Sequence, residues 1–364
     1  MIASDARSFQ HGIDFLEKKD GSFTLIWASA GNPPTGADKD GNWRHNIYHA
    51  TINPNNLTSI KPELLISEDE AQEPASSAIS EDGSIMITME DGWNVKNNVA
   101  QRYGLYHDDL TPLKPYPQMI LDGGHSGHVT SVGNHFVVFY SDEWVNGGGV
   151  DELGSGDDVL LEVYSSKGVL EAKADVSVGK ETRDWWPMLA GGEKNTLLLW
   201  QRFMDSKTYA NLMFSLYNPS KKSFTHTASM LDTRIKYYTY DAQYIKSLKR
   251  FLVTGTYQEG GGFAYLIDEK GKVSAQNLSL PEFVREAQPA IYHDKTKVLV
   301  AYPQAPNGLQ LLELTKSSIA LKRQIKDTYN WSYSGTDGIF LDKASLYFVS
   351  LSEKGLVEKK FSLK

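Results

Sequence analysis

Apolar and polar positions along this chain form a pattern that recurs seven times. Each copy has an apolar strand, a tight turn, a more strongly apolar strand and then a further apolar strand. The strongly apolar segments are Phe23–Ala28, Ile85–Met89, Phe136–Tyr140, Thr196–Trp200, Phe251–Thr256, Val298–Tyr302 and Leu346–Val349. They start roughly 45 to 60 residues apart, as the four-stranded blades of a β-propeller do. We therefore predict an all-β fold, a seven-bladed β-propeller of four-stranded antiparallel blades.

The segments between these strands support a single domain over residues 1–364. Helical periodicity is hard to find, whereas β-branched and aromatic runs bounded by Gly, Asn and Asp are frequent. Asp20-Gly21, Asp82-Gly83 and Gly133-Asn134 are turn residues that tolerate a positive φ. The last blade, Ser334–Leu363, has the weakest pattern, and we expect a strand from the N-terminus to help close the ring.

A propeller of this kind places particular loops on one face. The first strand of an up-and-down blade starts at the end where the second strand finishes, so the flanking loops share a face. These loops are rich in aromatic, basic and amide side chains, which makes this face the predicted binding face. The predicted substrate-binding residues are His11, Trp93, Asn94, Arg183, Trp185, Trp186, Gln201, Gln243, Tyr257 and Arg285.

The segment Gly123-Gly124-His125-Ser126-Gly127-His128 leads into the third blade with two histidines. A neutral imidazole accepts a proton near neutral pH and an imidazolium returns one, and the glycines allow a ligand to approach the backbone closely. His125 and His128 are therefore candidate catalytic residues. The alternatives are ordinary loop histidines or a metal site, for which the sequence offers no third ligand.

Two further segments supply a cation and phenols to the same face. Arg202 follows the buried strand of the fourth blade and can clamp a carboxylate, or else form a salt bridge between blades. Lys236–Tyr244 contains four tyrosines, of which Tyr238, Tyr240 and Tyr244 should share one side. We expect Tyr240 or Tyr244 to reach the site and the other tyrosines to pack between blades.

Indoles and a long insertion complete the predicted face. Trp93, Trp185 and Trp186 can stack on sugar rings, although packing between blades is the equally simple interpretation. Residues 147–158 are rich in Gly and carboxylates, but their spacing does not match a calcium-binding EF-hand loop. We interpret this insertion as a lid or rim.

Composition restricts the partners. The formal net charge is −8, which argues against a nucleic-acid binder. Cysteine is absent, which excludes disulfides and thiolate metal sites, and no apolar run reaches the roughly 18 residues of a membrane span. The chain starts Met1-Ile2-Ala3 without a signal-peptide pattern, so it is either cytoplasmic or a mature segment with an added Met.

Several of these segments resemble the seven-bladed β-propeller ulvan lyases of marine bacteria. The resemblance rests on Phe9–Phe15, Gly123–His128, Arg183–Pro187, Trp200–Phe203 and Lys236–Tyr244, and it extends over about Phe9 to Phe361. It implies cleavage of ulvan, a sulfated polysaccharide of rhamnose-3-sulfate and uronic acid, by β-elimination at the uronate. His and Tyr would transfer protons, and Arg would neutralise the uronate carboxylate.

Carried onto this sequence, those roles fall on His125 or His128, on Tyr244 or Tyr240, and on Arg202. The resemblance implies no catalytic cofactor, although a structural calcium or zinc ion is compatible with it. The expected partner is an anionic algal polysaccharide, without nucleic acid or membrane. We expect a secreted or periplasmic monomer whose signal peptide is missing from this sequence.

Two other functions remain open at this stage. A glycoside hydrolase on the same scaffold needs two carboxylates at roughly 5 to 9.5 Å across the scissile bond. Candidates for that pair are Glu73, Glu90, Asp142 and Glu143. A non-catalytic glycan-binding propeller would use its aromatic residues for stacking alone.

Overall fold

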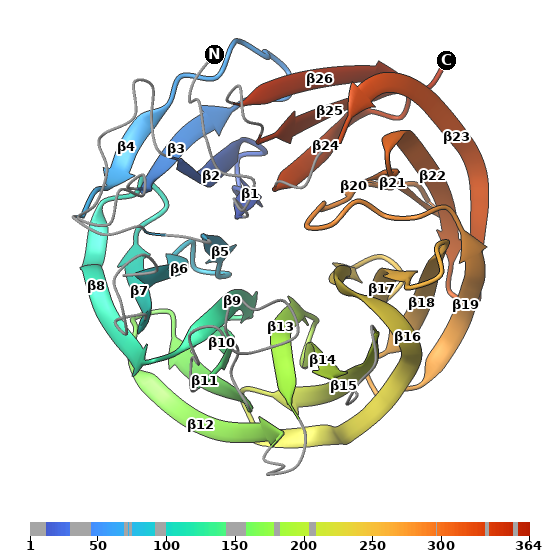
Figure 1. Cartoon of the computed structure of the whole chain (residues 1–364). Coiled ribbons are helices and arrows are strands. Elements are labelled where there is room, and N and C mark those ends of the chain that lie inside the picture. Colours follow the sequence, from blue (N-terminus) through green and yellow to red (C-terminus); the bar gives the residue numbers. More distant parts are fainter. Residues whose placement is uncertain are drawn as a thin grey trace, which may run out of the picture.

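The computed structural model describes residues 12–29, 45–68, 72, 75–91, 100–142, 158–177, 183–203, 209–295, 297–331, 335–351 and 356–364. Across these residues every regular element is a β-strand. The sheets stand radially around a central axis, and the chain passes once around the ring (Figure 1). The predicted all-β propeller is thus confirmed.

Four sheets are four-stranded and antiparallel, with strands in chain order. Blade 1 contains β1 (Ile13–Glu17), β2 (Phe23–Ser29), β3 (Asn46–Ile52) and β4 (Glu63–Ile66). Blade 2 contains β5 (Ser76–Ile79), β6 (Ile85–Asp91), β7 (Ala100–Tyr106) and β8 (Pro112–Asp122). Blade 3 contains β9 (His125–Val132), β10 (His135–Ser141), β11 (Val159–Ser165) and β12 (Leu170–Ser177). Blade 6 contains β20 (Ala290–His293), β21 (Val298–Pro303), β22 (Asn307–Thr315) and β23 (Ser318–Asn330).

Blades 4 and 5 are joined into one seven-stranded sheet by a single long strand. The sheet contains β13 (Asp184–Gly191), β14 (Thr196–Phe203), β15 (Ala210–Asn218), β16 (Ser223–Ile245), β17 (Arg250–Tyr257), β18 (Gly262–Asp268) and β19 (Val273–Leu280). The first part of β16 pairs with β15, and its last part, Tyr240–Ile245, pairs with β17. One strand is therefore the outer strand of blade 4 and the inner strand of blade 5.

Blade 7 has three strands among the described residues, β24 (Thr336–Asp342), β25 (Ser345–Ser350) and β26 (Val357–Ser362). It meets blade 1 directly, since the Phe15 amide donates to Asp337 Oδ2 at 2.8 Å. Residues 1–11, which precede β1, lie outside the described part of the chain, so the expected closing strand from the N-terminus stays a prediction.

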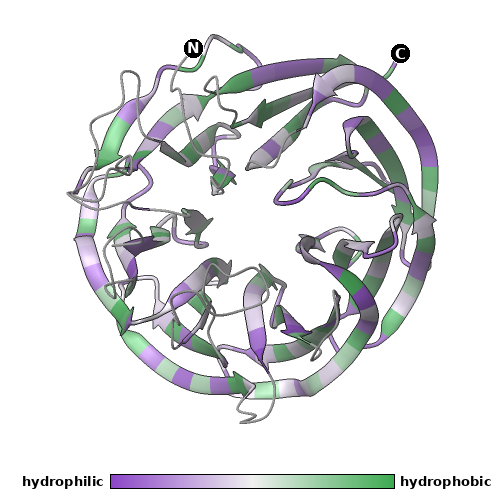
Figure 2. Cartoon of the chain, in the orientation of Figure 1, coloured by the Kyte–Doolittle hydropathy of each residue, from purple (hydrophilic) through white to green (hydrophobic). Residues whose placement is uncertain are grey.

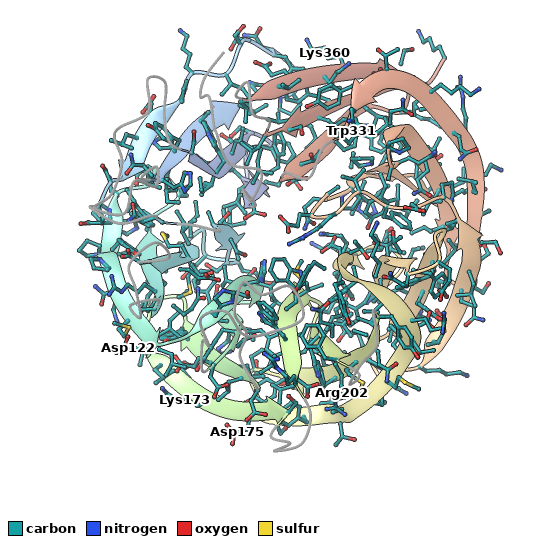
Figure 3. The ribbon with its side chains drawn as sticks, viewed as in Figure 1. Asp122, Lys173, Asp175, Arg202, Trp331 and Lys360 are labelled. Carbon is teal, nitrogen blue, oxygen red and sulfur yellow. The ribbon has the colours of Figure 1, made fainter. Side chains whose placement is uncertain are left out.

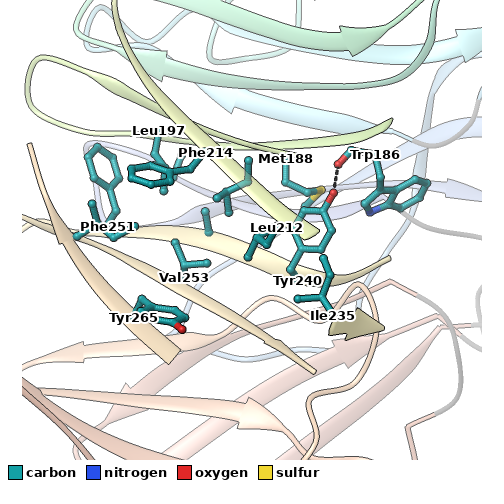
Figure 4. Packing of buried hydrophobic residues seen from close by; sticks show 14 of the residues in the cluster. Trp186, Met188, Leu197, Leu212, Phe214, Ile235, Tyr240, Phe251, Val253 and Tyr265 are labelled. Carbon is teal, nitrogen blue, oxygen red and sulfur yellow. Dashed lines mark hydrogen bonds between the residues drawn. The ribbon is translucent and has the colours of Figure 1, made fainter. Parts of the chain in front are cut away.

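The core lies between blades. Buried apolar residues form seven clusters, and each contains side chains from two neighbouring blades. This arrangement is consistent with the predicted seven blades. Figure 4 shows the cluster between blades 4 and 5, which includes Leu197, Phe214 and Phe251. The outer strands instead alternate hydrophilic and hydrophobic residues, because one of their sides faces solvent (Figure 2).

Strand register fixes two faces of the ring. His125 at the start of β9 pairs with Ser141 at the end of β10, so first-strand starts and second-strand ends share one face, here called the upper face. Hairpins between first and second strands form the lower face. Gly21, Gly83 and Gly133 adopt positive φ there (79°, 97° and 60°), as their turn positions predict.

Candidate functional site

Four consecutive blades have a non-glycine residue in the left-handed backbone region close to the start of their first strand. These residues are Ser126 (φ 53°), Trp186 (φ 59°), Tyr238 (φ 62°) and Glu286 (φ 57°), in blades 3, 4, 5 and 6. Such a conformation costs about 1 to 3 kcal/mol at each residue and is concentrated at functional sites in proteins. We call them the four left-handed turns. Their clustering on the upper face marks it as the candidate functional face.

Side chains of the preceding blades hold these turns in place. The Ser126 amide donates to Glu90 Oε1, and the Tyr238 amide donates to Gln201 Oε1 at 3.1 Å. Glu90 and Gln201 are 1% and 0% exposed and come from the second strands of blades 2 and 4. Buried polar groups of this kind need such partners, so the turns at Ser126 and Tyr238 depend on the preceding blade.

Side chains from blades 3 to 6 form a continuous row across the upper face. The His128 ring centroid lies 6.1 Å from Trp186, and the Trp186 ring lies 4.9 Å from Tyr238. The Arg285 guanidinium stacks 4.4 Å from the Tyr238 ring and 5.3 Å from the Trp186 ring. We call these four residues the aromatic–cation row. The row places one imidazole and one guanidinium against the rings of Trp186 and Tyr238.

The hydrogen bond made by His128 indicates its tautomer. Its Nδ1 lies 3.0 Å from the Ser126 carbonyl oxygen, which only accepts hydrogen bonds, so Nδ1 carries the proton. In the neutral ring the lone pair is then on Nε2. His128 is half-buried, and its neutral form is therefore oriented to accept a proton through Nε2.

His125 has a different environment. It is 2% exposed, its Nδ1 lies 2.5 Å from Ser126 Oγ and its Nε2 lies 3.4 Å from Glu90 Oε2. Trp185, itself 2% exposed, donates its indole N–H to the same Ser126 Oγ at 3.2 Å. His125 lies beneath the upper face and supports the Ser126 turn, whereas His128 lies on the aromatic–cation row.

Arg202 is engaged within its own blade. Its Nε and Nη2 donate to the two carboxylate oxygens of Asp184, each at 2.7 Å, and Asp184 is fully buried. These hydrogen bonds raise the pKa of the Arg202 guanidinium. The predicted role as substrate clamp is not supported by this geometry, because the bidentate pair already neutralises its charge. The predicted alternative was a salt bridge between blades, but this one joins β13 and β14 of blade 4.

The two candidate tyrosines lie at opposite ends of the blade 5 part of β16, Tyr240–Ile245. The Tyr240 hydroxyl donates to the Trp186 carbonyl oxygen (Figure 4), and burial raises its pKa well above the usual range. Tyr244 is next to the lower hairpin, 5.0 Å from Phe251, and the expectation that it shares the upper-face site is wrong. The row contains Tyr238 instead, which sequence reasoning assigned to packing.

The other predicted binding residues are mostly structural here. Trp185 and Trp186 are 2% and 5% exposed, so neither presents an open indole face. Gln243 donates to Asp241 Oδ2 at 3.3 Å and to Gln288. Tyr257 donates to Asp232 Oδ2 at 2.8 Å. Arg183 lies at the start of blade 4, where its carbonyl oxygen accepts from the Phe203 amide at 2.9 Å.

Some predictions concern residues that the structure does not describe. They are His11, Glu73, Trp93, Asn94, Glu143 and positions 147–157 of the insertion. Among the described residues, no group of three or more His, Asp or Glu could hold a metal ion. A search of the same residues finds no helix long and apolar enough to cross a membrane.

A cavity of about 260 Å³ adjoins the aromatic–cation row between blades 5, 6 and 7. It is lined by Lys236, Tyr237, Thr239, Glu282, Phe283, Val284, Arg285, Ala305 and Trp331. Trp331 lies near β24, and Arg202 lies in a different sector of the ring, near β13 to β15 (Figure 3). Arg285 is therefore the arginine that connects the row with this cavity.

Comparison with solved structures supports the architecture. The chain is similar to an ulvan lyase of a polysaccharide lyase family bound to a glucuronate–rhamnose-3-sulfate saccharide, with a TM-score of 0.54 and 10% identity over 100% of this chain and 96% of the other. It is also similar to the polysaccharide lyase Uly1, with a TM-score of 0.53 and 8% identity over 99% and 91%.

A chain of the mitotic checkpoint complex is equally similar, with a TM-score of 0.57 and 9% identity over 100% of this chain and 94% of that one. Comparisons with protein-family models and with curated proteins gave no match. At identities this low, the likeness shows the propeller fold alone, and function must be argued from the site.

Proposed function

We propose that this protein is a polysaccharide lyase that cleaves a uronate-containing sulfated polymer of the ulvan type by β-elimination. The observation that carries this proposal is the aromatic–cation row, where His128 and Arg285 flank the rings of Trp186 and Tyr238. The similarity to two polysaccharide lyases of the same fold agrees with it.

The negative charge of the uronate carboxylate must be neutralised before the C5 proton can leave. Arg285 is suited to this role because its side chain is 21% exposed and is oriented by Glu286, whose Oε1 accepts from Nε at 2.8 Å. A guanidinium at this place stabilises the enolate that develops as the C5–H bond breaks.

His128 is the proton-transfer group in this proposal. Its Nε2 takes the C5 proton, the C4–C5 double bond forms, and the C4–O4 bond breaks. The resulting imidazolium returns the proton to O4 when the C5 proton and O4 lie on the same side of the sugar ring. This sequence conserves protons and requires no water, nucleophile or organic cofactor.

Glycoside hydrolysis is less well supported by the described carboxylates. Glu90 is 1% exposed and holds Ser126 and His125, and Asp184 is fully buried against Arg202. Neither can flank a scissile bond on the surface. Asp142 lies at the rim, where its Oδ1 accepts from the Asp158 amide at 3.2 Å.

The test is incubation of the protein with ulvan while the ultraviolet absorbance of the conjugated unsaturated uronate is followed. We expect a steady rise with the wild type and none with His128→Ala. Reducing sugar released without that absorbance would identify a hydrolase. Saturable binding without any product would identify a glycan-binding propeller, and either result would overturn the proposal.

A further inference from the structure

The cavity between blades 5, 6 and 7 has the features of a small binding site next to the reactive groups. One wall is Arg285, which also belongs to the aromatic–cation row, and another is the β16 segment that carries Lys236 and Tyr237. Its volume of about 260 Å³ is slightly below the range of typical ligand pockets, which is about 300 to 1,000 Å³. Such a space suits one sugar unit rather than several.

Burial and hydrogen bonds fix the residues that line this cavity. The Trp331 indole is 4% exposed and donates its N–H to the Gly308 carbonyl oxygen at 2.7 Å. The Phe283 amide donates to Thr256 Oγ1 at 3.0 Å, and the Thr239 hydroxyl donates to the Lys236 carbonyl oxygen at 2.6 Å. A site held by packing and hydrogen bonds before binding loses little entropy when a ligand enters.

The basic lining residues of the cavity are Lys236 on β16 and Arg285 between blades 5 and 6. Arg285 pairs with Glu286 Oε1 at 2.8 Å, whereas Lys236 forms no ion pair with a described residue. Glu282 is the acidic lining residue, and its carboxylate lies against the β17–β18 turn, where Oε1 is 2.9 Å from the position of a Cβ on Gly260. Lys236 is therefore the lining cation that an acidic group of a ligand can pair with.

We infer that this cavity is a subsite for a second anionic group of the polymer, carried by a sugar unit close to the one that reacts at His128. The inference rests on the proposed function for the identity of the polymer. The shared chemistry is an anionic oxygen group, either a sulfate ester or a second carboxylate. Lys236 is its charge-specific contact, while Arg285 is shared with the reacting uronate.

The experiment compares Lys236→Ala and Lys236→Glu with the wild type. The matched control is Lys246→Ala, because Lys246 is also exposed but lies at the lower hairpin of the same blade. Kinetics are measured on ulvan, on chemically desulfated ulvan and on a non-sulfated polyuronate. Equilibrium binding of an ulvan oligosaccharide is measured by calorimetry with each variant, so that the subsite is tested even without turnover.

We expect Lys236→Ala to raise KM and the oligosaccharide Kd about fivefold, as for a single surface charge pair, with kcat unchanged. Lys236→Glu should weaken binding further, and added salt should reduce both effects. An effect that disappears on desulfated ulvan identifies a sulfate ester, and one that persists identifies a carboxylate. Unchanged KM and Kd in both Lys236 variants would overturn the subsite. Absence of turnover in the wild type would instead overturn the proposed function.

Discussion

At the scale of single residues, the site depends on where each arginine and its carboxylate partner lie. Arg202 forms a bidentate pair with the fully buried Asp184. Arg285 instead pairs with Glu286 through Nε and stacks on the rings of Trp186 and Tyr238. Sequence reasoning could identify both arginines on the upper face. It gave the catalytic role to Arg202 and a binding role to Arg285, because the cross-strand pairing of Arg202 with Asp184 is not visible in the sequence.

Arg285→Ala should lower kcat on ulvan by two orders of magnitude or more, because removing an electrostatic contact to the developing charge typically costs about 10² to 10³. Steady-state kinetics by ultraviolet absorbance measure this, and thermal unfolding checks that the fold is retained. Turnover within a few fold of the wild type would show that another cation binds the carboxylate.

Arg202→Ala should mainly reduce stability. Removal of the guanidinium leaves a buried Asp184 carboxylate without its partner, which costs about 3 kcal/mol in the free energy of unfolding. Chemical denaturation measures this loss. The double variant Arg202→Leu with Asp184→Asn should recover much of it, because no buried charge remains. A stable but inactive Arg202→Ala would return the catalytic role to Arg202.

Tyr238 shows why part of the site could not be predicted. The alternation of side chains along a strand placed Tyr238 with Tyr240 and Tyr244. A left-handed residue interrupts that alternation, and Tyr238 carries no sequence sign of positive φ because it is not glycine. By contrast, the His pair in a Gly-rich segment was visible from composition alone.

At the scale of elements, the important feature is a polar residue near the end of a second strand. Its side chain accepts a hydrogen bond from a backbone amide of the next blade. Glu90 holds Ser126, Gln201 holds Tyr238, and Thr256 holds Phe283. The repeated apolar strands made the propeller predictable. The polar residues that follow those strands looked like ligand-binding side chains, because exposure cannot be read from type, and the structure shows them buried.

Gln201→Leu should destabilise the protein by about 2 kcal/mol, because the buried Tyr238 amide loses its acceptor. Activity should fall more than stability alone explains, since the row depends on the Tyr238 turn. Denaturant unfolding and initial rates at low temperature give the two quantities. Gln324→Leu on the exposed outer strand β23 is the control, and equal effects in both variants would remove the proposed holding role.

At the scale of the whole molecule, carboxylates on the inner strands link blades around the axis. Asp337 accepts from the Phe15 amide across the blade 7–blade 1 junction, and Asp14 Oδ2 accepts from the Ser77 amide at 2.7 Å across the next one. Asp241 accepts from Gln288 of blade 6 at 3.3 Å. Burial raises the pKa of Asp14 to about 6 and that of Asp241 to about 7, from an ordinary 3.8.

These raised pKa values predict a definite pH dependence of stability. Between about pH 4 and pH 7 the folded protein keeps protons on Asp14 and Asp241 that the unfolded chain has lost. The free energy of unfolding should therefore fall as pH rises through this window and level off above it. Thermal unfolding at pH 5 and pH 8 measures the difference, which should be smaller in Asp241→Asn. A wild type equally stable at both values would contradict this assignment.

The most direct test of the proposed lyase is digestion of ulvan in water enriched in heavy oxygen, followed by mass spectrometry of the oligosaccharides. β-Elimination breaks the C4–O4 bond without adding water, so we expect unsaturated products that gain no solvent oxygen in the cleavage step. Saturated products labelled with heavy oxygen, or an uncut polymer, would contradict it.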